Sequence, residues 1–130
     1  MFVNTQHAGV DVAAPDVLEA ADGGTRPRLS RNRAYGCTGV APAHSVYVAG
    51  AVAHNLLTIT PQTHADGGAQ TAGVTTAARR GAARHLAGAA TVLIAGSPAT
   101  RMGNPSTHNG GNSDGARVTP SQRKVLVLGP

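Results

Sequence analysis

The sequence predicts an all-β protein built from short hairpins and long loops. Gly and Pro account for 17 and 8 of the 130 residues, a content typical of a chain with many turns and unfavourable for a helical bundle. Residues 46–56 and 92–103 repeat one layout, in which an apolar run is followed by a glycine and a short return. The repeat predicts two similar hairpins within a single domain spanning residues 1–130.

The composition predicts a thin apolar core. The apolar residues are mostly Ala and Val, and the only aromatic residues are Phe2, Tyr35 and Tyr47, so each buried side chain removes little area from water. A disulfide within the chain is excluded, because Cys37 is the only cysteine. A metal held by some of the six histidines, or a partner protein, is therefore the expected source of extra stability.

The first 43 residues show no strong hydrophobic period. Residues 1–16 alternate loosely and predict an extended arm. Residues 16–19 resemble a capping box and predict one helical turn. Residues 25–43 are basic and rich in Gly and Pro, which predicts a loop carrying Cys37.

The centre of the chain contains the first hairpin. Residues 46–49 and 52–59 are predicted strands, joined through Gly50 in a tight turn. Residues 61–73 are expected to form a loop. Residues 74–90 are ambiguous, because Ala and Arg favour a helix whereas two glycines interrupt the stretch and no apolar stripe is present.

The last third of the chain contains the second hairpin. Residues 91–95 and 98–102 are its predicted strands, with Pro98 at the start of the return, where a missing N–H is tolerated. Residues 103–119 are rich in Asn, Ser and Gly and predict a loop. Residues 122–128 predict a final strand.

Charge and motifs narrow the class of function. The net charge of +5 would permit nucleic-acid binding, but the arginine clusters carry no nucleic-acid motif, so we expect a solvated or partner-facing basic surface and no nucleic-acid ligand. The first residues lack a signal-peptide pattern and no apolar run reaches the length of a membrane span, which predicts synthesis and folding in the cytoplasm. The six carboxylates are scattered and nucleophile motifs are absent, so we expect no enzymatic activity.

Several segments, in order along nearly the whole chain, resemble the PAAR-repeat proteins and, among them, a PAAR-like group that opens with a similar N-terminal segment. The clearest is Pro98-Ala99-Thr100-Arg101, which differs at one position from the Pro-Ala-Ala-Arg signature of the family. The other segments are residues 1–6, 14–17, 53–55, 84–86 and 120–128.

The resemblance implies a small conical all-β fold with a pseudo-threefold base. It implies that one copy caps the trimeric spike of a contractile injection system, such as a type VI secretion system, an extracellular injection system or a phage-tail-like particle. In that role the chain would sharpen the spike for piercing a target membrane, touch that membrane transiently and dock an effector or toxin cargo. It would assemble in the cytoplasm and leave the cell at the tip of the particle. Which surface faces the spike is unknown from the sequence.

The resemblance also implies a structural zinc ion held by histidines and a cysteine. One thiolate and three imidazoles satisfy tetrahedral Zn²⁺, and the loops that flank the two hairpins supply Cys37, His64, His85 and His108. His54 is the alternative ligand, although its place on the return strand favours a hydrogen bond within the body. The competing interpretation is that the loop histidines are solvated and that Cys37 is a small apolar residue.

The alternative function is a small zinc-binding module, or a metal-dependent hydrolase, that is not associated with a spike. A free monomer with measurable turnover would support this alternative, whereas copurification with a trimeric spike would support the spike-tip role.

Overall fold

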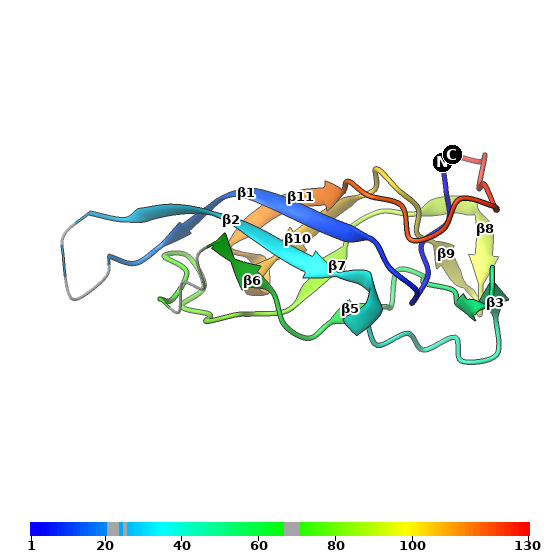
Figure 1. The fold of residues 1–130 in the computed structure, drawn as a ribbon, viewed down its shortest axis with the longest axis horizontal. Helices are drawn as coiled ribbons and strands as arrows, with labels where there is room; N and C mark the ends of the chain where they lie inside the picture. The colour runs from blue at the N-terminus through cyan, green and yellow to red at the C-terminus, as the bar shows by residue number, and fades with distance from the viewer. Residues whose placement is uncertain (21–23, 25, 67–70) are drawn as a thin grey trace.

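The computed structural model describes residues 1–20, 24, 26–66 and 71–130. Its main element is a seven-stranded antiparallel sheet in the order β5-β7-β10-β11-β1-β2-β6 (Figure 1). The strands are β1 (Val10–Leu18), β2 (Arg28–Tyr35), β5 (Ile59–Thr60), β6 (His64–Ala65), β7 (Ala83–His85), β10 (Pro105–His108) and β11 (Ser113–Arg117). The 3-10 turns η2 (Gly36–Thr38) and η4 (Asn109–Gly111) follow β2 and β10. The all-β prediction is confirmed.

The sheet curls until its two edges are held by one short segment. The edge strands β5 and β6 are separated by only residues 61–63, yet β5 pairs with β7 and β6 pairs with β2. Residues 59–65 therefore link both edges, and the sheet encloses an interior.

Two separate hairpins lie at one end of the elongated body, which we call the base. The first pairs β3 (Tyr47–Val48) with β4 (Ala51–Val52), and the second pairs β8 (Ala89–Ile94) with β9 (Ser97–Ala99). Both chain termini lie at the same end, whereas β1 and β2 reach furthest toward the opposite end (Figure 1). The predicted pair of similar hairpins is thus present, although the strand expected over residues 52–59 ends at Val52.

The interior of the sheet is largely polar, although Ala13, Leu18 and Ala34 are also buried. In β1 the inward positions Asp11 and Asp16 are buried, while Val10 and Val12 on the outer face are only half-buried. A register shift between Ala13 and Asp16 lets both carboxylates face inward. In the same way β10 turns Ser106 and His108 inward and β11 turns Ser113 and Arg117 inward. Such an interior is stable only where its polar groups are hydrogen-bonded to one another.

The apolar core is small and lies at the base, separate from the polar interior. It consists of Val3, Ala43, Ala53, Ala89, Ile94, Ala99 and Val127, with Val46 and Val48 packed against it. Four of its seven buried members are alanines, so the core is as thin as the composition predicts.

Several local predictions were wrong. Residues 28–35 and most of residues 105–117, predicted to lie in loops, form β2, β10 and β11. The helical turn expected over residues 16–19 falls mainly on the last residues of β1, and residues 122–128 contribute a single bridge rather than a regular strand. Residues 25 and 67–70 of two predicted loops lie outside the described residues. No helix in the described part of the chain has the length and apolar character needed to cross a membrane.

Candidate functional site

Three segments far apart in the sequence meet at the base in a closed ring. They are centred on Asn4, His54 and Thr100, and each centre donates its backbone N–H to the carbonyl of the next. Asn4 donates to Thr100 at 2.9 Å, Thr100 donates to His54 at 3.3 Å, and His54 donates to Asn4 at 2.9 Å. The hydrogen bonds therefore return to their starting point after three steps, as a threefold arrangement requires.

The residues on either side of each centre repeat the same cycle. The residue before each centre bridges the residue after another centre, in the pairs Val3 with Arg101, Ala53 with Thr5, and Ala99 with Asn55. A further set of backbone hydrogen bonds runs from Gln6 to Val52, from Leu56 to Pro98, and from Met102 to Phe2. Three sets of contacts are thus related by the same pseudo-threefold axis.

Each ring segment extends outward into a lobe, and two of the lobes are the hairpins β3–β4 and β8–β9. Their turns are matched, because Ala49 and Gly50 have φ of 50° and 81° while Ala95 and Gly96 have φ of 50° and 78°. Both central residues of each turn have positive φ, which is the type I′ pattern that suits the twist of a two-residue hairpin.

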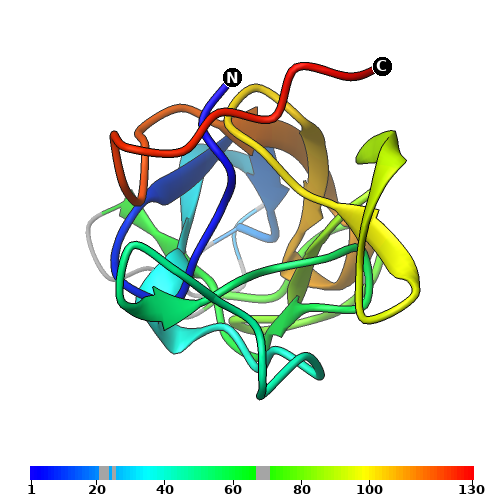
Figure 2. The ribbon, with the colours of Figure 1, turned by 90° about the vertical axis from the view of Figure 1, so that its right-hand side faces the viewer.

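The third lobe is built from the two ends of the chain. Val127 and Met1 exchange backbone hydrogen bonds, with N–H of Val127 donating to Met1 at 2.8 Å and the amino group of Met1 donating to Val127 at 3.2 Å. Phe2 bridges Leu126 in the adjacent position. Residues 125–127 therefore pair with residues 1–3 as β3 pairs with β4. Figure 2 looks onto the base, with both hairpins and both termini arranged around it.

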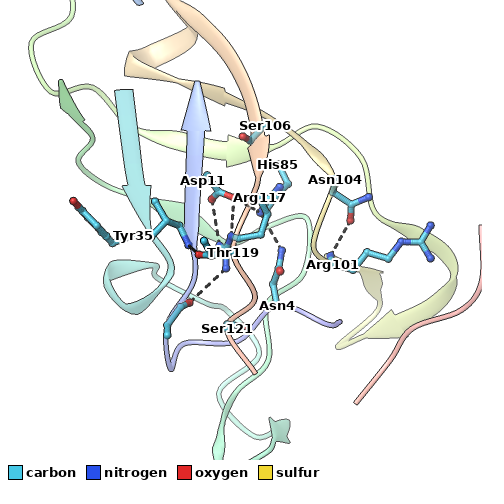
Figure 3. Close-up of polar contacts among 12 residues, drawn as sticks. Asn4, Asp11, Tyr35, His85, Arg101, Asn104, Ser106, Arg117, Thr119 and Ser121 are labelled. Carbon is cyan, nitrogen blue, oxygen red and sulfur yellow. Dashed lines mark hydrogen bonds and ion pairs between the residues drawn. The ribbon is translucent and has the colours of Figure 1, made fainter. Parts of the chain in front are cut away.

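Behind the ring, a buried ion pair lies in the sheet interior (Figure 3). Arg117 donates from Nε to Oδ1 of Asp11 at 2.7 Å and from Nη2 to Oδ2 at 3.2 Å, and both side chains are buried. Nε2 of His85 lies 3.7 Å from Oδ1 of Asp11 and accepts a hydrogen bond from the amide of Asn4 at 3.2 Å. Asn4 thus connects the backbone ring to His85, which lies beside the ion pair.

His108 lies in the same interior with both ring nitrogens hydrogen-bonded. Nδ1 donates to Oδ1 of Asn32 at 3.0 Å, and Nε2 accepts from the hydroxyl of Ser106 at 3.0 Å. The amide of Asn32 donates to the carboxylate of Asp16 at 3.0 Å. Because Oδ1 of Asn32 can only accept, Nδ1 of His108 carries a proton, and in the neutral ring Nε2 is the acceptor.

Burial favours the neutral form of all three interior histidines. Burial, with the positive charge of Arg117 as a smaller cause, lowers the pKa of His54 to about 4. Burial likewise lowers the pKa of His108 to about 4, against the opposing charge of Asp11. Burial also lowers the pKa of His85. The three imidazoles are accordingly uncharged near neutral pH.

The structure does not bring the predicted zinc ligands together. His85 and His108 are buried in the sheet interior, whereas His64 is half-buried on β6, where its ring contacts Tyr35, and Cys37 is exposed in η2. Among the residues that the structure describes, no three His, Cys, Asp or Glu side chains form a group able to hold a metal ion. The arrangement therefore does not fit a four-ligand zinc centre, and zinc binding stays a prediction.

The alternative ligand His54 takes the role expected from its position. Its Nε2 donates to Oε1 of Gln6 at 2.9 Å, so the side chain is a hydrogen-bonded member of the body. His54 and Thr100 are also equivalent members of the ring, as the repeat of the two hairpins indicates.

Sequence reasoning missed the third lobe and the polar interior. The third lobe had a signal, because residues 125–129 (Val-Leu-Val-Leu-Gly) match residues 46–50 and 92–96 in apolar pattern and in the position of the glycine. The interior had none, since its members are polar residues in stretches that lack any apolar period.

A comparison with protein families identifies the domain. A model described as the toxin PAAR-like domain matches residues 9–115. The chain belongs to this family. PAAR-like domains are spike-associated, toxin-related modules of a structural rather than catalytic class. Comparisons with curated proteins and with solved structures found no match.

Proposed function

We propose that this PAAR-like domain caps the trimeric spike of a contractile injection system, with one copy on each trimer. The observation that carries the proposal is the closed ring at the base, in which Asn4, His54 and Thr100 repeat one set of contacts three times. A homotrimer has a threefold axis, and a single chain can match that axis only if it contains three similar units of its own. The ring and its three lobes supply that match.

The polar interior suits a mechanical role. The sheet interior is crossed by hydrogen bonds and by the ion pair of Asp11 and Arg117, and Leu18 is its one large aliphatic side chain among the described residues. Buried hydrogen-bond networks hold one arrangement of the surrounding strands, and most members of this network have partners, although Oδ1 of Asn4, Nδ1 of His85 and Oγ1 of Thr100 have none. We infer that this interior keeps the body rigid while the particle pierces a target membrane, and that the end opposite the base leads.

The further parts of this role follow from the position at the tip. The domain would be assembled in the cytoplasm, leave the cell at the tip of the particle on firing, and touch the target membrane transiently. Carriage of an effector or toxin cargo belongs to the same proposal.

Stoichiometry tests the proposal. The trimeric spike encoded nearest to this chain should copurify with it, and native mass spectrometry should find one copy of the chain for three spike chains. A complex with three copies for three would contradict capping along the threefold axis. A monomer that fails to bind the spike and hydrolyses a substrate would favour the alternative of a free metal-dependent module.

A further inference from the structure

The three lobes of the base place three apolar side chains at equivalent positions. Each stands one residue before the last paired residue that precedes the turn of its lobe. In β3 this residue is Tyr47, paired with Val52; in β8 it is Leu93, paired with Pro98; and in the lobe made by the chain ends it is Leu126, paired with Phe2. We call Tyr47, Leu93 and Leu126 the base triad.

The triad is exposed, whereas the residue that follows each member along the chain packs inward. Tyr47, Leu93 and Leu126 are 64%, 60% and 52% exposed, respectively. The next residues are Val48, which packs against the apolar core, and Ile94 and Val127, which belong to it. Strand alternation explains this contrast, because successive side chains point to opposite faces. The inner residue of each lobe thus packs against the core, and the outer face presents the exposed triad member, to which the third lobe adds Leu128 at 82% exposure.

The three lobes contain no charged side chains, although the N-terminal ammonium and the guanidinium of Arg101 both donate to Val127 in the third lobe. The chain contains 11 Lys and Arg and 6 Asp and Glu residues, yet residues 46–52, 89–99, 125–129 and 1–3 contain none of them. Depletion of charge around exposed aromatic and aliphatic side chains is typical of the buried centre of a protein interface.

We propose that the base triad is the contact by which this domain recognises its partner, a homotrimer that offers one apolar socket from each of its three chains. The inference rests on the proposed spike-capping function and adds to it which side chains make the contact. The threefold relation of the lobes decides the kind of partner, because three equivalent side chains on one chain match three identical sockets related by a threefold axis.

The test compares single substitutions by their affinity for the purified trimeric spike encoded nearest to this chain. Tyr47→Asp, Leu93→Asp and Leu126→Asp should each weaken binding at least about 10-fold, since each buries an unpaired carboxylate against an apolar socket. The matched control is Leu29→Asp on β2, which lies toward the opposite end and is 70% exposed; its affinity should equal that of the unaltered chain.

A conservative variant and the thermal stability of each variant separate a lost contact from a lost fold. Tyr47→Leu makes the three positions more alike and should retain binding within a few-fold of the unaltered chain. The thermal midpoint of every variant, measured alone, should stay close to that of the unaltered chain, which separates lost contact from lost fold. Where an Asp variant unfolds, the corresponding Ser variant takes its place.

The possible results separate the two proposals. If the unaltered chain binds the spike and the three Asp variants bind equally well, the base triad is wrong and the capping function stands. If only one of the three positions matters, the threefold contact is likewise overturned. If the unaltered chain does not bind, both proposals fail. If it instead forms a dimer that Leu93→Asp abolishes, the face serves self-association and the proposed partner is wrong.

Discussion

The ion pair between Asp11 and Arg117 is the residue-scale feature on which the interior most depends. Asp11→Asn should lower the free energy of unfolding by about 3–5 kcal/mol, because it leaves the guanidinium of Arg117 buried without a counter-charge. Chemical denaturation of the purified variant measures this change. The double variant Asp11→Asn with Arg117→Met should recover part of the loss.

A surface ion pair provides the control. Arg33 and Asp66 lie 2.6 Å apart, but both side chains are about two-fifths exposed. Arg33→Ala should therefore change the free energy of unfolding by no more than about 1 kcal/mol. A loss as large as that of Asp11→Asn would contradict the distinction between the buried and the exposed pair.

Acidification should destabilise the protein through its buried histidines. His54 and His108 have pKa values of about 4 in the folded state, below the ordinary value of 6.5. Between these values the unfolded chain binds more protons than the folded one, so stability falls as pH falls from about 6.5 toward 4, by up to about 1.4 kcal/mol per pH unit for each histidine.

Denaturation at a series of pH values measures this slope. His108→Gln should make the slope shallower, because one of the titrating groups is removed. A stability that is constant from about pH 7 to pH 5 would contradict neutral buried histidines.

A substitution of Cys37 tests whether this residue is a zinc ligand, as the family resemblance implies. Because Cys37 is exposed and no metal-binding group forms among the described residues, Cys37→Ser should change the free energy of unfolding by less than about 0.5 kcal/mol. It should also leave the metal content of the purified protein unchanged. Parallel loss of metal and of stability in Cys37→Ser would instead support the set of Cys37, His64, His85 and His108.

At the scale of single elements, the two hairpin turns carry a local strain. Ala49 and Ala95 have φ of 50°, a conformation that L-residues other than Asn, Asp and Gly adopt at a cost. Ala49→Asn and Ala95→Asn should each stabilise the protein by about 0.5–1 kcal/mol, since Asn-Gly is the preferred type I′ pair. Thermal unfolding of each variant checks this expectation, with Ala90→Asn, an exposed position in β8, as the control that should not stabilise.

The elements that sequence reasoning found are those with apolar inner faces. The two hairpins were predicted, over residues 46–59 and 91–102, because each shows an apolar run followed by a glycine and a short return. Their inner residues Val48 and Ile94 pack at the apolar core. Residues 1–16 were predicted to be extended and include most of β1, but strands β2, β10 and β11 were missed because Asn32, His108 and Arg117 take their inward positions. Hydrophobic periodicity identifies a strand only where the interior that it faces is apolar.

At the scale of the whole molecule, the fold class and the family followed from the sequence, but the arrangement of the site did not. Gly, Pro and the repeated hairpin were sufficient for an all-β fold, and six short segments in order along the chain were together sufficient for the family. The third lobe was missed because its first strand, residues 125–127, and its return, residues 1–3, lie at opposite ends of the chain. A repeat divided in this way shows no adjacent copy to a search along the sequence.

Because the third lobe is made from the two ends of the chain, the chain is interrupted at the turn of that lobe. We expect that it could equally be interrupted at the turn of either of the other two lobes. Leu128 and Gly129 stand where the other lobes have Ala49-Gly50 and Ala95-Gly96, so a circular permutant that joins Gly129 directly to Met1 would close the third turn. Opened between Gly50 and Ala51, this permutant should fold to a similar stability, whereas the same permutant opened between Ser106 and Thr107, within strand β10 in the middle of the sheet, should not. Equal loss of fold in both would show that the lobes are not interchangeable. The three lobes then form a closed cycle, and the turn of each lobe is an equivalent position for the ends of the chain.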